Sequence, residues 1–221
     1  MAMAFACMLG VGCEHDASTP APPDSDPATN ETNNVSNDIP VIVAMGDSIT
    51  AGTEIQGPSY PALLSRWIGI DVYNEGVGGD SSSRGAALVD DAVRFYHPDY
   101  VLLMYGTIDV WGTDRYDQVI GNYDTMVTVL RESGATPVIA TIPPRYSDDP
   151  YLAELHTVLN QRIRRFTRDA GVYLVDVEAA FADRPELMLP DGIHPNDAGT
   201  AVIADQFYDA LIDLGVTDTS P

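Results

Sequence analysis

Short apolar runs alternate with helix-length segments along this chain, and the alternation limits the folds that it can adopt. Four runs are strong, and a weaker one lies between the first two. They are Val41–Met45, Ile70–Asn74, Tyr100–Tyr105, Pro137–Ile142 and Val172–Val177. The runs are rich in Val, Ile and Tyr and mostly continuous, which is typical of strands buried on both faces.

Segments of helical character separate these runs. They lie at about 59–68, 82–96, 115–133 and 150–170, with a last one near 196–213. A helix between each pair of strands predicts right-handed crossovers and a parallel sheet. We therefore expect an α/β fold in which ligands bind beyond the carboxyl ends of the strands.

The chain divides into four parts by composition. Residues 1–13 form a short leader of small and apolar residues, and residues 14–40 are rich in Pro, Asp, Asn and Thr. The second part cannot bury enough apolar surface to offset its ordering entropy, so we expect a flexible tether. Residues 41–214 have the composition of one globular domain, and 215–221 form a tail. The sequence contains no run of about 18 apolar residues, so it predicts no transmembrane helix.

The leader resembles a bacterial lipoprotein signal in which Cys13 is the lipidated residue. That interpretation implies an exported protein, either in the periplasm or cell envelope with a membrane tether through Cys13, or secreted. No basic residue precedes Arg66, so the usual positive start is missing and a truncated secretory signal is the alternative. Cys7 and Cys13 are the only cysteines, so the body has no cysteine nucleophile and no disulfide.

The charge of the chain restricts its partners. There are 33 Asp and Glu residues against 11 basic ones, for a formal net charge of −22. A chain this negative repels phosphate backbones, which argues against a nucleic-acid partner. The sequence does not indicate an oligomeric state.

Three of the expected strands lead into small, turn-forming motifs. Gly46-Asp47-Ser48 follows the first strand, Asn74–Ser81 with its glycines follows the second, and Gly106-Thr107-Ile108-Asp109 follows the third. A serine in a tight strand-to-helix turn is exposed, and backbone N–H groups nearby can bind a developing oxyanion. Taken alone, such motifs are more often ordinary turns, loops or helix caps.

His194 differs from the other histidines. Asp191 precedes it by three residues across a glycine turn. The carboxylate can accept a hydrogen bond from Nδ1 and leave Nε2 to take a serine proton, although an Asx turn before a helix is the structural alternative. For His97, near a helix end, and His156, within a helix, we expect capping or surface roles.

Together these motifs resemble the SGNH (GDSL-type) hydrolase family over roughly Val41 to Leu214. The resemblance implies a flavodoxin-like three-layer α/β/α sandwich with a five-stranded parallel sheet, which hydrolyses esters without a metal or cofactor. It assigns Ser48 as nucleophile, His194 as base and Asp191 as the orienting carboxylate. The backbone N–H groups of Ser48 and Gly79 would form the oxyanion hole.

One family position departs from the pattern. Ile108 stands where the family has an asparagine whose amide is the last oxyanion donor, and an isoleucine cannot donate. Losing one such donor lowers kcat by about 10²–10³. The hydroxyl of Thr107 and the amide of Asn74 are the two candidates for replacing it.

The expected substrate is a small-molecule ester with a small or single acyl chain, as for a carboxylesterase or lysophospholipase. We expect Asp47, Thr107 and Trp111 to contact it, with further apolar loop residues either lining an acyl pocket or packing the loops. Two alternatives stay open. One is a carbohydrate O-deacetylase, and the other is a non-catalytic binding module with a degenerate site.

Overall fold

The computed structural model describes residues 39–110 and 115–216, and in that part of the chain strands and helices alternate as expected. The strands are β1 (Ile42–Gly46), β2 (Val72–Gly76), β3 (Tyr100–Met104), β4 (Thr136–Ala140) and β5 (Tyr173–Val175). The α-helices are α1 (Ser48–Ala51), α2 (Tyr60–Ile68), α3 (Ser82–Tyr96), α4 (Tyr116–Ser133), α5 (Pro150–Ala170), α6 (Val177–Phe181) and α7 (Asp197–Asp213), and one 3₁₀ turn, η1, spans Pro185–Leu187.

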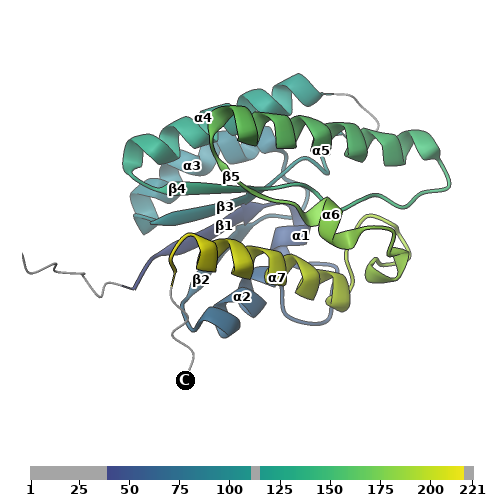
Figure 1. Cartoon of the computed structure of the whole chain (residues 1–221), viewed down its shortest axis with the longest axis horizontal. Coiled ribbons are helices and arrows are strands. Elements are labelled where there is room, and N and C mark those ends of the chain that lie inside the picture. The colour runs from purple at the N-terminus through teal and green to yellow at the C-terminus, as the bar shows by residue number, and fades with distance from the viewer. Residues whose placement is uncertain (1–38, 111–114, 217–221) are drawn as a thin grey trace, which may run out of the picture. The chain divides into compact units, whose positions relative to one another are not determined.

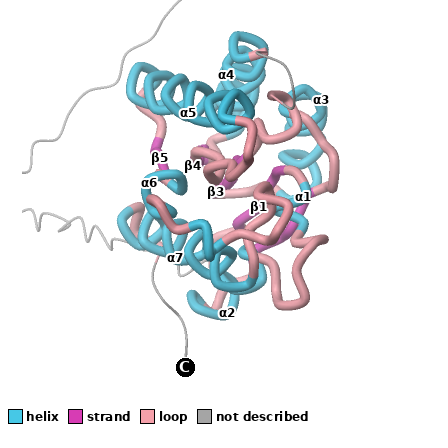
Figure 2. Tube along the Cα trace, turned by 90° about the vertical axis from the view of Figure 1, so that its right-hand side faces the viewer, coloured by secondary structure: helices cyan, strands magenta, loops and turns pink. Residues whose placement is uncertain are grey.

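The five strands form one parallel sheet in the order β2-β1-β3-β4-β5. Helices α3, α4 and α5 cover one face, and α2 and α7 cover the other (Figures 1 and 2). This order is that of the flavodoxin-like fold, in which ligands bind where the chain direction across the sheet reverses, between β1 and β3. The predicted fold class, a three-layer sandwich around a five-stranded parallel sheet, is confirmed.

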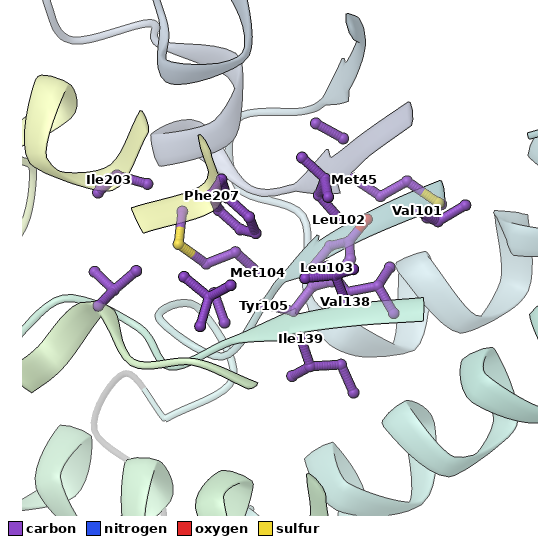
Figure 3. Packing of buried hydrophobic residues seen from close by; sticks show 14 of the residues in the cluster. Met45, Val101, Leu102, Leu103, Met104, Tyr105, Val138, Ile139, Ile203 and Phe207 are labelled. Carbon is purple, nitrogen blue, oxygen red and sulfur yellow. The ribbon is translucent and has the colours of Figure 1, made fainter. Parts of the chain in front are cut away.

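The central strands are buried because helices cover both faces of the sheet. Every residue of β1 is buried, and β3 is buried from Val101 onward. Figure 3 shows side chains from β1, β3, β4 and α7 that belong to one core. On the face that α2 and α7 cover, Tyr60 of α2 stacks on Phe207 of α7 with ring centroids 5.1 Å apart. Burial of so much apolar surface is the main stabilising contribution to a fold of this kind.

The expectation of burial on both faces is wrong for β2. Its three central residues, Tyr73, Asn74 and Glu75, are exposed. The strand lies at the edge of the sheet and pairs only with β1. The second apolar run was also the weakest in the sequence, which agrees with this position.

Several helices end at a residue in the left-handed backbone conformation. Gly134 and Gly171 end α4 and α5 in the left-handed conformation, with φ of 87° and 61°, which glycine adopts without steric cost. His97 caps α3 in the same region, with φ of 49°.

His156 corrects an expectation, since it is buried in α5 rather than at the surface. Its Nδ1 lies 3.1 Å from the carbonyl oxygen of Pro143. Burial lowers the pKa of this imidazole to about 4, so the ring is neutral at physiological pH and fixes the loop after β4.

Several expectations lie outside the described residues. They concern the leader 1–13 with Cys13, almost all of the tether 14–40, Trp111, and most of the tail 215–221. The predictions made for these parts, export and lipidation included, stay predictions. Among the described residues no helix is long and apolar enough to cross a membrane.

Candidate active site

Ser48 lies at the carboxyl end of β1, where the chain turns directly into α1. Asp47 caps that short helix, its Oδ1 accepting a hydrogen bond of 2.9 Å from the amide of Ile49. The turn is so tight that a Cβ on Gly46 would lie 2.0 Å from Oγ1 of Thr50. Only glycine fits there, and the turn leaves Ser48 8% exposed at the edge of the sheet.

His194 reaches Ser48 from the loop between η1 and α7. Its Nε2 lies 2.9 Å from Oγ of Ser48, and its Nδ1 lies 2.7 Å from Oδ2 of Asp191. The other oxygen of Asp191 accepts hydrogen bonds from the amides of Ile193, at 2.9 Å, and His194, at 3.0 Å. The structure therefore brings the three predicted residues together in one chain of hydrogen bonds.

These contacts set the charge of Asp191. Burial alone would raise the pKa of its carboxyl, but hydrogen bonds from the His194 ring and from two backbone amides outweigh it and lower that pKa below the ordinary value. The carboxylate is thus ionised at neutral pH. It holds Nδ1–H of His194, so Nε2 is left as the hydrogen-bond acceptor that faces the serine.

The glycine loop after β2 packs against the nucleophile turn. The amide of Val77 donates to the carbonyl of Gly46 at 3.0 Å, and a Cβ on Gly78 would lie 4.0 Å from Cβ of Ser48. Gly79 follows with φ of 83°, a conformation that favours glycine. The loop is placed where backbone N–H groups can approach a group bound to Ser48.

Neither expected substitute for the missing amide is free to act as one. Asn74 donates its side-chain amide to the carbonyl of Thr50 at 2.9 Å and to Oγ of Ser59 at 3.2 Å. It therefore ties β2 to the segment after α1. Thr107 is 1% exposed, so its hydroxyl does not reach the surface at which an ester carbonyl would bind.

The structure places the predicted substrate contacts Asp47 and Thr107 beneath the surface of the site, and their contact with a substrate stays a prediction. Both side chains are buried at 1% exposure, and in the described part of the chain neither Oδ2 of Asp47 nor Oγ1 of Thr107 makes a hydrogen bond of normal geometry. Burial raises the pKa of the Asp47 carboxyl to about 6, although the Ile49 amide and Thr107 oppose that shift. Asp47 serves as a helix cap under the site, and the third predicted contact, Trp111, lies outside the described residues.

Asp109 is a positioning residue that sequence reasoning missed. Its carboxylate accepts hydrogen bonds from the amide of Ser82, at 2.9 Å, and from the hydroxyl of Ser82, at 2.6 Å. Ser82 is the first residue of α3, so this contact joins the loop after β3 to the helix that follows the glycine loop. No spacing in the sequence connects the two, because 27 residues separate them.

Among the described residues, cavities lie close to the segment that carries Asp191 and His194. A crevice lined by Ser48, Ile55 and His194 adjoins a cavity of about 450 Å³ whose walls include Leu189 and Ala198. On the Asp191 side, a cavity of about 640 Å³ is lined mainly by the loop after β4. Within residues 39–110 and 115–216, no group of three or more His, Cys, Asp or Glu side chains is arranged to hold a metal ion.

Comparison with known proteins places these features in a family. The model of the GDSL-like lipase/acylhydrolase family matches residues 44–202. An arylesterase of Vibrio mimicus is 27% identical over 183 residues, covering 77% of this chain and 88% of that protein. A GDSL lipase of Mycobacterium tuberculosis is 30% identical over 186 residues, covering 75% and 78%. Among solved structures, a carbohydrate esterase of family 3 from Talaromyces cellulolyticus has a TM-score of 0.66 and 25% identity, covering 79% of this chain and 97% of that one.

Proposed function

Because the chain belongs to the GDSL-like lipase/acylhydrolase family, it is a carboxylic ester hydrolase, and we propose that Ser48, His194 and Asp191 carry out the reaction. The observation that carries this assignment is the unbroken chain of hydrogen bonds, 2.9 Å from Ser48 to His194 and 2.7 Å from His194 to Asp191. These are the contacts that activate a serine as a nucleophile.

The reaction begins with acylation of the serine. Nε2 of His194 takes the proton of Ser48 while Oγ attacks the ester carbonyl carbon. Asp191 stabilises the imidazolium that results. The tetrahedral intermediate then collapses, the bond to the leaving alcohol breaks, and His194 gives its proton to that alcohol. A water molecule, deprotonated by His194, attacks the acyl-enzyme and releases the carboxylic acid and free Ser48.

The oxyanion of each intermediate lies against the backbone N–H groups of Ser48 and Gly79. Ile108 contributes no third donor, which leaves the transition state less stabilised than in a three-donor site. Such a site hydrolyses esters with good leaving groups most readily, because their transition states need less stabilisation. We propose small or single-chain acyl esters as the substrates, aryl esters among them, and the similarity to an arylesterase supports this choice.

Substitution of the nucleophile tests the assignment. The variant Ser48→Ala is expected to lose all turnover of p-nitrophenyl acetate and p-nitrophenyl butyrate, with an unchanged circular dichroism spectrum. Turnover that stays at the wild-type level would refute the mechanism.

Removal of acetyl groups from carbohydrate is a second candidate, supported by the similarity to a carbohydrate esterase. Acetate released from acetylated xylan, compared with hydrolysis of p-nitrophenyl butyrate at equal enzyme concentration, separates the two. The family relationship favours either enzyme over the non-catalytic binding module.

A further inference from the structure

A groove leads away from the Ser48–His194 pair on one side of the histidine. It starts at the crevice beside Ser48 and His194, and it widens into the cavity of about 450 Å³. Glu54 and Ile55 line both, so the crevice and the cavity adjoin each other. The residues of the glycine loop and Ile108 are not among the residues that line either cavity.

The chemistry of the reaction assigns an occupant to this groove. Three groups surround the attacked carbon apart from Oγ of Ser48: the oxyanion, the acyl chain and the leaving alcohol. The oxyanion points to the Ser48 and Gly79 amides. The oxygen of the leaving alcohol must lie within hydrogen-bond reach of Nε2 of His194, which protonates it. The alcohol therefore lies on the His194 side of the carbon, where the groove begins.

We infer that the groove binds the leaving alcohol of the ester, and that it selects neutral or cationic alcohols over phosphate-bearing ones. This inference rests on the proposed function, since it needs His194 as the proton donor. It names the substrate by its leaving group, which the family relationship does not.

The shape of the groove suits an organic alcohol. Its walls carry the apolar side chains of Ile55, Leu189 and Ala198, and its volume falls in the range of small-molecule sites. One wall is the segment after α1, held in place by a hydrogen bond of 3.2 Å from the amide of Gly57 to Oδ1 of Asp197. A Cβ on Gly57 would lie only 3.0 Å from that carboxyl carbon, so the wall is closely packed on the start of α7.

The charge of the groove is negative. Glu54 and Asp197 line it, and among the described residues no Lys or Arg does. The start of α7 adds no anion site, because the amides of Ala198 and Gly199 already donate to Oδ1 of Asn196. A phosphate would therefore meet two carboxylates without a compensating positive charge among the described lining residues, whereas an ammonium group would be attracted.

Acetate esters of three alcohols of similar size test the charge selection at low salt. They are choline acetate, its uncharged isostere 3,3-dimethylbutyl acetate, and the anionic 3-sulfopropyl acetate. We expect kcat/KM to fall in that order, by roughly threefold to tenfold between the cationic and the anionic ester. The difference in kcat/KM between the cationic and the anionic ester should shrink in Glu54→Gln and in 1 M NaCl. Equal values for the three esters, or an unchanged spread in Glu54→Gln, would overturn the charge selection.

The matched control for charge is Glu132→Gln. Glu132 is exposed near the end of α4, at the opposite edge of the sheet from Ser48. The substitution removes the same charge without touching the groove, so the spread among the three esters should stay as in the wild type.

Filling the groove tests the occupant. The variant Ile55→Trp should lower kcat/KM for 2-naphthyl butyrate at least tenfold more than it lowers kcat/KM for methyl butyrate. Ile212→Trp makes the same change at an exposed position of α7 and should alter neither. If Ile55→Trp instead changes the preference among methyl esters of different acyl length, the groove binds the acyl chain and the inference is wrong.

The two failures are distinguishable. If the proposed function is wrong, Ser48→Ala retains turnover or the wild type hydrolyses none of these esters. If only the inference is wrong, the wild type hydrolyses them and Ser48→Ala does not, but the Glu54 and Ile55 variants leave the alcohol preference unchanged. The circular dichroism spectrum and thermal melt report folding of each variant, and the Glu54→Gln series decides if Ile55→Trp does not fold.

Discussion

Replacing Asp47 by asparagine should stabilise this protein in a pH-dependent way. The side chain is buried at 1% exposure, and one of its oxygens makes no hydrogen bond of normal geometry in the described part of the chain. In Asp47→Asn, Oδ1 can still accept from the Ile49 amide and keep the cap of α1. The new amide group can donate to the neighbouring hydroxyl of Thr107, whose Oγ1 makes no hydrogen bond of normal geometry there.

The magnitude follows from the pKa of the carboxyl. Burial raises it from 3.8 to about 6, so between those pH values the folded protein holds a proton that the unfolded chain has lost. Stability therefore falls as the pH rises through this window and stays lower above it. The difference corresponds to about 3 kcal/mol, and Asp47→Asn removes that penalty. We expect no gain at pH 3.5 and a gain of about 2–3 kcal/mol at pH 8.

Urea unfolding, monitored by circular dichroism at several pH values, measures this gain in stability. The variant is compared with wild type at each pH, which cancels the titration of the other carboxylates. Asp124→Asn, at an exposed position of α4, is the matched control and should give no pH-dependent difference. A stability difference that does not change with pH, or a loss of stability at pH 8, would refute the reasoning.

Three further predictions concern the site itself. Ile108→Asn should raise kcat for p-nitrophenyl butyrate by about 10²–10³ if the amide completes the oxyanion hole, and an unchanged kcat would show that the position does not face the oxyanion. Asp191→Asn should lower kcat by up to about 10⁴, because the ring of His194 loses the partner that fixes its tautomer; steady-state kinetics with unchanged thermal stability would establish this. Gly192→Ala should destabilise the protein by about 3 kcal/mol or more and abolish turnover. The φ of Gly192 is 65°, and an added Cβ would lie 1.8 Å from the carbonyl oxygen of Tyr146, so a thermal melt that matches wild type would contradict this prediction.

The sequence predicted those features that depend on order along the chain. Periodicity gave the strands and helices, and the position of Ser48 and Asp191–His194 after strands placed them at one edge of a parallel sheet. Their contact follows from topology, since the carboxyl ends of all parallel strands lie at that edge. The exposure of β2 was not predictable from its residues, because it depends on which strand ends the sheet.

Contacts between side chains far apart in sequence were beyond such reasoning. Burial of His156 depends on the loop at Pro143 folding over α5, and Asp109 acts through Ser82 on another helix. Asp47, which adjoins Ser48, was expected to contact the substrate. Neighbouring residues in a tight turn point in different directions, however, and the carboxylate turns inward to cap α1.

The nucleophile and its base are 146 residues apart in sequence, at the first strand and just before the last helix of the fold. A chain still being synthesised therefore carries a serine that has no reactive partner until almost the whole domain has emerged. Ester hydrolysis becomes a measure of complete folding, because a fragment that lacks either end is inert. The same separation suggests that two halves expressed apart would regain activity only by reassembling the sheet.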